Sequence, residues 1–287
     1  MSKPLQFIVT ICILALTSSP VLAAGQECST AITQVKKERN LLKKRQLLNR
    51  AMELCPQDAE LHYICAYTAE RLRKYDKAQT NYLKATELDS NYAEAYFGLG
   101  DIYMVLGNAR SAIDAFERGL ELIPQNKRAR LSLDLARIKY KSESGEKISS
   151  AEFIQVMQES KGEETTQGAV DGPLLRMQIH FYSASSQLSE QAMDQLINVG
   201  KALENPALSE KKFEISGHTD DTGTSEANLI LSKYRAEQVR NYLLETFSIQ
   251  PEALIVAYYG DTRPATPNTS NQSRAINRRV EFRRLKQ

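Results

Sequence analysis

The sequence is poor in the residues that most enzyme and metal sites use. It has no tryptophan, four cysteines and three histidines among its 287 residues. No two histidines stand at the spacing of a metal site, and we find neither paired carboxylates nor a nucleophile–base set. The net charge of +2 lacks the basic excess typical of proteins that bind nucleic acid or membrane surfaces. These absences predict a protein that is not an enzyme and needs no metal or cofactor.

Long apolar runs are also missing. A compact apolar segment covers residues 5–16 after Lys3, and it is too short for a bilayer, which takes about 20 residues. Small residues follow, so we predict a secretory signal over residues 1–24, cleaved after Ala23 or Ala24. A retained N-terminal anchor is the alternative. No later run is long enough for a membrane helix, which predicts an exported mature chain with no membrane span.

Three cysteines remain after this cleavage: Cys28, Cys55 and Cys65. Cys28 invites a lipoprotein interpretation. Glu27 argues against it, because lipoprotein signals carry small or apolar residues before the modified cysteine. In an oxidising compartment one pair of the three can close as a disulfide. The sequence does not choose the pair, and buried free thiols in helices fit it equally well.

Residues 25–140 repeat with a period of 34. The clearest unit, residues 93–126, carries Tyr96, Leu99, Gly100, Tyr103, Ala112, Phe116 and Pro124. These positions resemble the tetratricopeptide repeat, which is a helix–turn–helix unit. The unit at 59–92 matches less fully, only the second helix of an earlier unit is clear, and a capping helix is expected at 129–140. Gly119 departs from the family, which usually has alanine there. We expect an all-α solenoid whose core comes from stacking of the units.

Tetratricopeptide stacks have a concave face lined by the first helix of each pair. By their position in the repeat, these residues are expected to point into it: Tyr63, Tyr67, Phe97, Asp101 and Met104. Exposed aromatic side chains on such a face suit a peptide or protein partner. The alternative is that some of them pack against each other or against the second domain. The partner's identity does not follow from the sequence.

Residues 141–172 change in character and read as a linker. Two stretches, KSESGEK and KGEETTQG, are rich in Ser, Glu, Gly, Lys and Thr. Between them, residues 148–159 have helical spacing of apolar residues, and Ser149 or Ser150 can cap a helix there. We expect a short helix that leads into the second domain or packs on it.

From residue 174 the apolar pattern alternates between strands and helices. Strands are expected at 174–182, 212–216, 254–259 and 278–285, and helices at 189–204 and 225–246. On the second helix, Leu229, Val239 and Leu243 are expected on the buried side. Strands that alternate with helices imply a mixed sheet with helices packed on one or both faces.

Four motifs in this half occur in a specific order. SGHTDDTG at 216–223 is followed by the helix residues Asn228, Leu231, Ser232, Arg235 and Ala236, then YYGDTRP at 258–264 and NRRVEF at 277–282. Together they resemble the OmpA C-terminal-like domain, a family that includes peptidoglycan-associated and flagellar stator proteins. The resemblance spans residues 179–282. It implies an α/β (α+β) sandwich domain that binds peptidoglycan without covalent attachment, through the meso-diaminopimelate of the stem peptide.

The resemblance also implies which side chains hold that ligand. The Asp and Arg that bind diaminopimelate in the family correspond here to Asp220 and Arg235. A carboxylate accepts hydrogen bonds from the ligand ammonium, and a guanidinium fits its carboxylate. Thr222 and Asn228 are expected to brace or donate near the pocket. The alternative from the residues alone is that Asp220 caps the following helix and that Arg235 is an ordinary surface residue.

Two positions depart from the family pattern, and a basic tail needs an explanation. Ala227 stands where an aromatic is common, which leaves one wall of the pocket more open, and Ser273 stands where glycine is common. The arginines and Lys286 in residues 274–286 alternate about Val280 and Phe282. A solvated strand face therefore fits them better than nucleic-acid binding.

We predict a multidomain protein: a signal at 1–24, a tetratricopeptide domain at 25–140, a linker at 141–172 and an OmpA-like domain at 173–287. It is expected in the periplasm, associated with peptidoglycan and the outer membrane, as the resemblance implies. Its expected partners are diaminopimelate-type peptidoglycan and an unknown envelope protein bound by the repeats. The alternative is an interaction scaffold whose OmpA-like domain no longer binds the wall. The pathway and the oligomeric state do not follow from the sequence.

Overall fold

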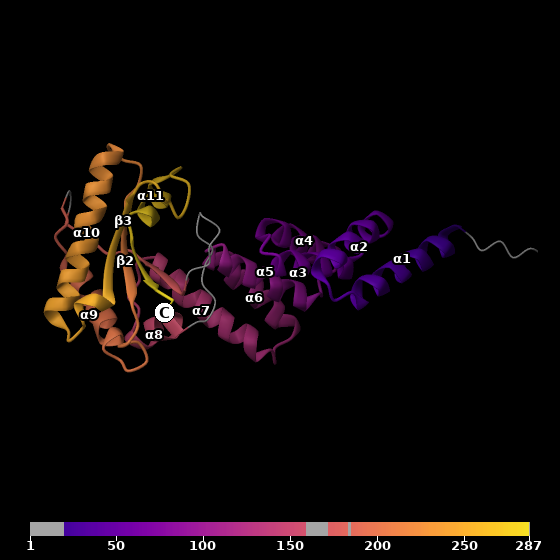
Figure 1. The fold of residues 1–287 in the computed structure, drawn as a ribbon, viewed down its shortest axis with the longest axis horizontal. Helices are drawn as coiled ribbons and strands as arrows, with labels where there is room; N and C mark the ends of the chain where they lie inside the picture. Colours follow the sequence, from indigo (N-terminus) through magenta and orange to yellow (C-terminus); the bar gives the residue numbers. More distant parts are fainter. Residues whose placement is uncertain (1–19, 159–171, 183–184, 287) are drawn as a thin grey trace, which may run out of the picture.

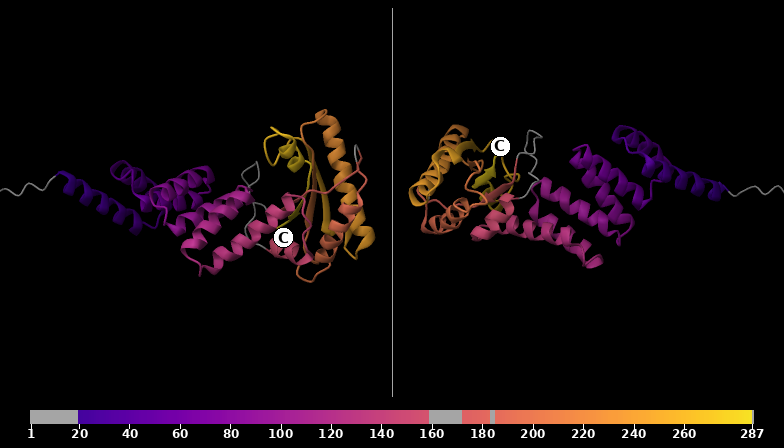
Figure 2. Two further views of the ribbon diagram at one scale, coloured as in Figure 1. Left: turned by 180° about the vertical axis from the view of Figure 1, so that it is seen from behind. Right: turned by 60° about the horizontal axis from the view of Figure 1, so that its bottom comes forward.

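The computed structural model describes residues 20–158, 172–182 and 185–286. The chain forms an elongated body (Figure 1), with an array of helices at one end and a sheet with its own helices at the other. Two further views (Figure 2) show that the first helix lies at the free end of the array, far from the sheet. Most of the predicted signal lies outside the described residues. No helix within them is long and apolar enough to cross a membrane.

Seven helices build the array as antiparallel pairs closed by one last helix. Their bounds are α1 Pro20–Lys37, α2 Leu41–Leu54, α3 Ala59–Arg71, α4 Tyr75–Leu88, α5 Ala93–Val105, α6 Ala109–Leu122 and α7 Lys127–Glu143. Side chains of Asn40, Asp58, Asn108 and Asn126 cap the N-termini of α2, α3, α6 and α7. Each cap satisfies backbone N–H groups that have no partner inside the helix. The expected helical solenoid is confirmed.

Glycines allow the helices of this array to approach closely. A Cβ on Gly98 would lie 2.3 Å from the Tyr82 ring, and a Cβ on Gly100 would lie 2.6 Å from the Phe116 ring. Gly119, the departure from the repeat pattern, has the same explanation, because a Cβ there would lie 2.5 Å from the ring of Phe97. Alanine at residue 119 is therefore incompatible with phenylalanine at residue 97 without movement of one of them.

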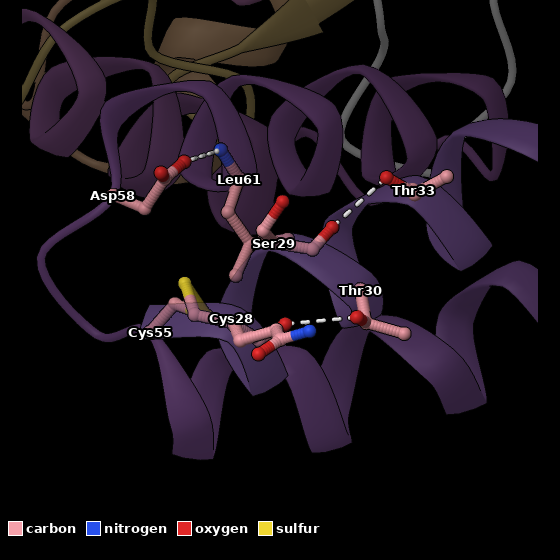
Figure 3. Close-up of a disulfide and its surroundings, with 8 residues drawn as sticks. Cys28, Ser29, Thr30, Thr33, Cys55, Asp58 and Leu61 are labelled. Carbon is pink, nitrogen blue, oxygen red and sulfur yellow. Dashed lines mark hydrogen bonds between the residues drawn. A yellow bond between two sulfur atoms is a disulfide. The ribbon is translucent and has the colours of Figure 1, made fainter. Parts of the chain in front are cut away.

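A disulfide between Cys28 and Cys55 joins α1 to the C-terminal end of α2 (Figure 3). Their Cα atoms lie 5.7 Å apart, and Cys65 is buried and free. The structure thus selects one of the pairs that the sequence left open. Because the sulfur of Cys28 is bonded to Cys55, it is not available for a thioether to lipid. Asp58, three residues after Cys55, caps α3 by accepting a hydrogen bond from the Leu61 N–H at 2.7 Å.

The second half contains a four-stranded mixed sheet in the order β1-β4-β2-β3. The strands are β1 Leu174–Met177, β2 Phe213–His218, β3 Leu254–Gly260 and β4 Val280–Arg284, and the helices are α8 Ser150–Gln158, α9 Glu190–Leu203, α10 Ser225–Thr246 and α11 Asn271–Asn277. A short 3₁₀ turn, η1 Pro251–Ala253, precedes β3. Strands β2 and β3 are parallel, and β4 runs antiparallel to both β1 and β2. The predicted mixed sheet is confirmed.

One face of the sheet is apolar and carries helices, whereas the other is polar. Ile215 pairs with Phe282, and Gly217 pairs with Val280, so these side-chain positions share a face. The Phe282 ring makes an edge contact with Phe153 of α8, and Gly217 lies against the Ser232 carbonyl of α10. On the opposite face stand His218 and Glu281, both buried. The polar face is therefore covered too, and it encloses charged groups.

The array and the sheet share one hydrophobic core. The largest buried cluster runs continuously from Ala93 in α5 to Phe282 in β4. The Ser142 hydroxyl of α7 donates to the Arg176 carbonyl of β1 at 2.8 Å, and the Gln178 amide donates to the Glu143 carbonyl at 2.6 Å. The first part of the expected linker is thus the end of α7, packed on the edge of the sheet. The second part, residues 159–171, lies outside the described residues.

The boundaries of several elements differ from those expected. Strand β1 ends at Met177, well before residue 182, and α11 occupies a stretch where no helix was expected. Leu229 is wrong as a core residue, since it is 40% exposed, although Val239 and Leu243 are buried. The buried face of α10 begins with the polar residues Asn228 and Ser232. A prediction that takes only apolar residues as buried therefore assigns the wrong face to the first turns of this helix.

Candidate functional site

The candidate site lies where the parallel strands β2 and β3 end and α10 begins. The Thr219 N–H donates to the Gly260 carbonyl at 2.9 Å, and the Gly260 N–H donates to the Ser232 hydroxyl at 3.0 Å. The position of Gly217 against the Ser232 carbonyl leaves no room for a side chain, since a Cβ would lie 2.0 Å from that oxygen. Close contact between strand and helix therefore fixes where the loop at 219–224 leaves the sheet.

Asp220 is buried at the start of this loop, with contacts on both carboxylate oxygens. Its Oδ2 accepts from Arg278 Nη1 at 2.5 Å, and its Oδ1 accepts from the Thr222 N–H at 2.9 Å. The Asn228 amide donates to the Asp220 carbonyl at 3.2 Å. Asp220 is not a helix cap, because Thr224 caps α10. Thr222 and Asn228 hold Asp220 in place, and Thr222 does so through its backbone.

The contacts keep Asp220 ionised. Burial by itself raises the pKa of this carboxyl, but the hydrogen bonds from Arg278 and from Thr222 outweigh it and hold the pKa below its ordinary value. The Arg278 side chain is 46% exposed, so solvent screens part of this attraction. The site therefore presents a negative charge that is paired with a half-exposed cation on its outer side.

Arg235 projects from α10 and lacks a hydrogen-bond partner for a buried nitrogen. Its Nε is buried and makes no hydrogen bond among the residues that the structure describes. The guanidinium carbon lies 4.9 Å from the centre of the Phe181 ring. Burial lowers the pKa of Arg235, Arg278 lowers it further, and Asp220 raises it. The side chain is thus held by an aromatic ring and lies within the electrostatic field of both Asp220 and Arg278.

The structure adds residues that the sequence analysis did not place in the site. Arg278, assigned to a strand face, contacts Asp220, and Arg274 of α11 binds Asp221 through Nε at 2.7 Å and Nη2 at 3.4 Å. Arg278 and Arg274 accordingly pair with the two adjacent carboxylates, and Arg235 lies near enough to Asp220 for that charge to raise its pKa. The NRRVEF motif carried the signal for Arg278, but nothing in the sequence indicated that its first arginine reaches a loop 58 residues away.

The two departures from the family pattern also have a place. Ala227 is exposed on the first turn of α10, so no bulky side chain stands there beside Asn228. Ser273 completes a capping box with Ser270 at the start of α11, through reciprocal hydrogen bonds. This cap orients the helix that carries Arg274. Neither departure touches Asp220 or Arg235.

A buried charge network lies behind the site on the polar face of the sheet. Glu281 Oε1 accepts from Arg279 Nε at 2.8 Å and lies 3.3 Å from Arg176 Nε, while Arg176 Nη1 lies 3.2 Å from Glu143 of α7. Burial lowers the pKa of His218, whose Nε2 lies 3.5 Å from Glu281 Oε2. This arrangement accounts for His218 as a neutral structural residue. No cluster of metal-ligating side chains exists within the described residues.

The predicted concave face contains a cavity of about 400 Å³, and four of the five predicted residues line it. Tyr63, Tyr67, Phe97 and Asp101 lie together there, with Arg128 of α7. Asp101 pairs with Arg128, and Phe97 is largely buried, with its ring against Gly119. Met104 does not line this cavity. It is buried in the core that continues toward the sheet.

Comparisons with known proteins agree with both halves. A model described as the OmpA family matches residues 180–278, and models described as TPR repeat and tetratricopeptide repeat match residues 73–107 and 93–126. The chain is 38% identical over 124 residues to the peptidoglycan-associated lipoprotein of Pseudomonas aeruginosa, which covers 41% of this chain and 71% of that protein.

Two further relatives resemble the same half of the chain. Outer membrane porin F of Pseudomonas aeruginosa is 31% identical over 108 residues, which are 37% of this chain and 30% of that protein. The crystal structure of the peptidoglycan-associated lipoprotein from Burkholderia pseudomallei matches with 27% identity and a TM-score of 0.34, over 37% of this chain and 87% of that one.

Proposed function

This chain belongs to the OmpA family, with tetratricopeptide repeats in front of the family domain, and from that premise we propose that it binds peptidoglycan through the loop–helix site of Asp220 and Arg235. Members of this family are not catalytic, so the site is one for binding. The ligand is the meso-diaminopimelate residue of the stem peptide. The protein is exported to the periplasm, where that polymer lies.

The observation that carries the proposal is the unused hydrogen-bonding capacity of Arg235. Its buried Nε has no partner among the described residues, although buried donors in native proteins are nearly always paired. A bound carboxylate supplies the missing acceptor, and the planar guanidinium can donate to both of its oxygens at once. Thus a binding role explains a feature that an ordinary surface arginine would not show.

The charges around the site match a zwitterionic ligand. Diaminopimelate carries an ammonium and a carboxylate on one carbon, at the end of its side chain. Asp220 accepts from the ammonium, while Arg235 binds the carboxylate. Arg278 already bonds Asp220 Oδ2, so it either shares that oxygen with the ammonium or turns toward the ligand carboxylate. Its half-exposed side chain leaves it free to make this turn.

The affinity of a single site follows from a few such bonds. Each charge-assisted hydrogen bond contributes about 1.5–3 kcal/mol, which places the dissociation constant for one stem peptide roughly between micromolar and millimolar. Retention on the wall then depends on rebinding to the many stem peptides nearby, and on any self-association of the protein.

The test is sedimentation with purified peptidoglycan of the diaminopimelate type. We expect the wild-type protein to pellet and both Asp220→Ala and Arg235→Ala to stay in solution. Lys233→Ala is the matched control, because Lys233 is an exposed cation on the same helix whose nearest charged partner, Glu237, is 3.9 Å away. Peptidoglycan that carries lysine in place of diaminopimelate should retain little protein, since lysine lacks the second carboxylate.

The second candidate function is a scaffold whose family domain no longer binds the wall. The aromatic cavity on the concave face favours a protein-binding role for the repeats in either case. The scaffold alone predicts that even the wild-type protein stays in solution with the wall polymer. Equal pelleting of wild type, Asp220→Ala and Arg235→Ala would instead reject the assignment of the pocket while leaving wall binding in place.

A further inference from the structure

The cavity on the concave face has aromatic walls. Tyr63 and Tyr67 come from α3, Tyr82 from α4 and Phe97 from α5. The Tyr82 ring packs against Gly98, and its hydroxyl donates a hydrogen bond to Glu70 Oε2 at 2.9 Å that holds the ring in place. The Tyr63 ring packs against it at a tilt of 55°, with ring centres 5.8 Å apart. Tyr67 is 44% exposed, so part of this aromatic wall faces solvent.

Carboxylates outnumber cations around these rings. Glu70, Glu94 and Asp101 line the cavity, against Arg71 and Arg128. Arg128 is occupied by its ion pair with Asp101, and Arg71 donates to the Tyr67 hydroxyl at 3.3 Å. Glu94 makes no hydrogen bond or ion pair with the described residues. One carboxylate beside the aromatic wall is therefore free to bind a ligand.

The titration of the tyrosines agrees with a negative cavity. The pKa of Tyr63 is raised first by burial and then by Glu94 and Glu70, and only Arg128 opposes this effect. Burial and Glu70 together raise the pKa of Tyr82. Negative charge near the phenols disfavours the phenolate form. The same field favours a cation at the mouth of the cavity.

We propose that this cavity binds a lysine or arginine side chain of an extended partner segment, between the tyrosine wall and Glu94. The proposal rests on the proposed role of the repeats as a partner-binding array. A cation over an aromatic face and beside a carboxylate gains from both contacts. The cavity volume of about 400 Å³ accommodates such a side chain together with part of its backbone.

An acidic segment fits the cavity less well. Its carboxylate would approach Glu70 and Glu94, and Asp101 already occupies Arg128. Like charges this close disfavour binding. An apolar segment would leave Glu94 without a partner and gain only from the rings. The charge of the cavity therefore selects a cation.

The experiment titrates the full chain with four nine-residue peptides. They are acetylated, amidated sequences of glycine and serine with one central arginine, lysine, norleucine or glutamate. The readout is the ¹³C signals of labelled tyrosines, assigned with Tyr63→Phe and Tyr67→Phe. We expect arginine and lysine peptides to shift these two tyrosines and to bind at least tenfold tighter than the norleucine and glutamate peptides. Added salt should weaken that binding.

Variants separate this site from the wall site. Glu94→Gln removes the charge from an exposed residue and should weaken the arginine peptide about tenfold, whereas Glu121→Gln, an exposed acid on α6 outside the cavity, should not. Both variants should still pellet with peptidoglycan, and Asp220→Ala should still bind the peptide. Equal or tighter binding of the glutamate peptide overturns the proposal. So does the absence of tyrosine shifts with the arginine and lysine peptides.

Discussion

Removal of the Arg235 side chain should abolish wall binding and leave the free protein about as stable as before. In the unliganded protein the buried Nε of Arg235 has no hydrogen-bond partner among the described residues. An unsatisfied buried donor costs about 1–3 kcal/mol. The Arg235→Ala substitution therefore relieves a cost at the same time as it deletes contacts.

The lost contacts are of similar size. The guanidinium lies over the Phe181 ring, with 4.9 Å between its carbon and the ring centre. Such a contact contributes about 0.5–2 kcal/mol. Because these terms oppose each other, we expect Arg235→Ala to change the free energy of unfolding by about 1 kcal/mol or less. This corresponds to a shift of at most about 4 °C in the melting temperature, because the array and the sheet share one core and form a larger unit.

Binding should change far more. A guanidinium–carboxylate contact with the ligand contributes about 1.5–3 kcal/mol for each bond, which is roughly a 10- to 100-fold loss of affinity. Arg235→Lys keeps the charge but loses the planar fork, so its affinity should lie between those of wild type and Arg235→Ala. These two variants distinguish the geometry of the contact from its charge.

The assays are thermal unfolding followed by circular dichroism and titration with a soluble muropeptide that contains diaminopimelate. The muropeptide should raise the melting temperature of wild type and have little effect on Arg235→Ala. An Arg235→Ala protein that melts more than about 4 °C below wild type would contradict the reasoning. So would one that binds the muropeptide normally, because Arg235 would then be a structural residue.

Three other predictions concern the framework of both domains. Gly119→Ala should lower the free energy of unfolding by about 1–2 kcal/mol despite the better helix propensity of alanine, because the added methyl meets the ring of Phe97. In a Phe97→Leu background, denaturant unfolding should show that the same substitution stabilises the protein. The free energy of unfolding should fall as the pH drops below about 6.5. Burial lowers the pKa of His218 in the folded protein, whereas the same histidine in the unfolded chain takes up a proton near its ordinary pKa. The His218→Asn variant should lose little stability between about pH 6.5 and 4.5. It should still lose stability below about pH 4.5, because the lowered pKa of Glu281 is unchanged. Cys55→Ala should cost about 3 kcal/mol, seen as faster hydrogen exchange in α1 and α2 with unchanged wall binding.

The repeat array could be read from the sequence because its information is local. Small and large residues recur every 34 positions, and each helix packs mainly against its neighbours in the chain, so the spacing indicated the fold. The capping helix and the identity of the four strands followed in the same way. Strand and helix ends were less predictable. Leu229 shows why, since the buried stripe of α10 begins with polar residues that bind the adjoining loop.

The site was only half determined by the sequence. The order of the motifs singled out Asp220 and Arg235. In the structure Asp220 lies in the loop before α10 and Arg235 near the middle of that helix, close enough for Asp220 to raise the pKa of Arg235. What the sequence could not indicate is that Arg278 bonds Asp220. That contact depends on β4 lying beside β2, and strand order is a property of the whole sheet.

The chain's periodicity and motif order therefore determined its domain types and the two charges expected to bind the wall, because short-range patterns encode helices, strands and family motifs. Only the tertiary structure decided that Cys28 pairs with Cys55, that α7 packs on the sheet, and that Arg278 contacts Asp220. Each of these depends on the approach of segments that are distant in sequence. The energy of such contacts comes from packing and burial, which no local pattern records.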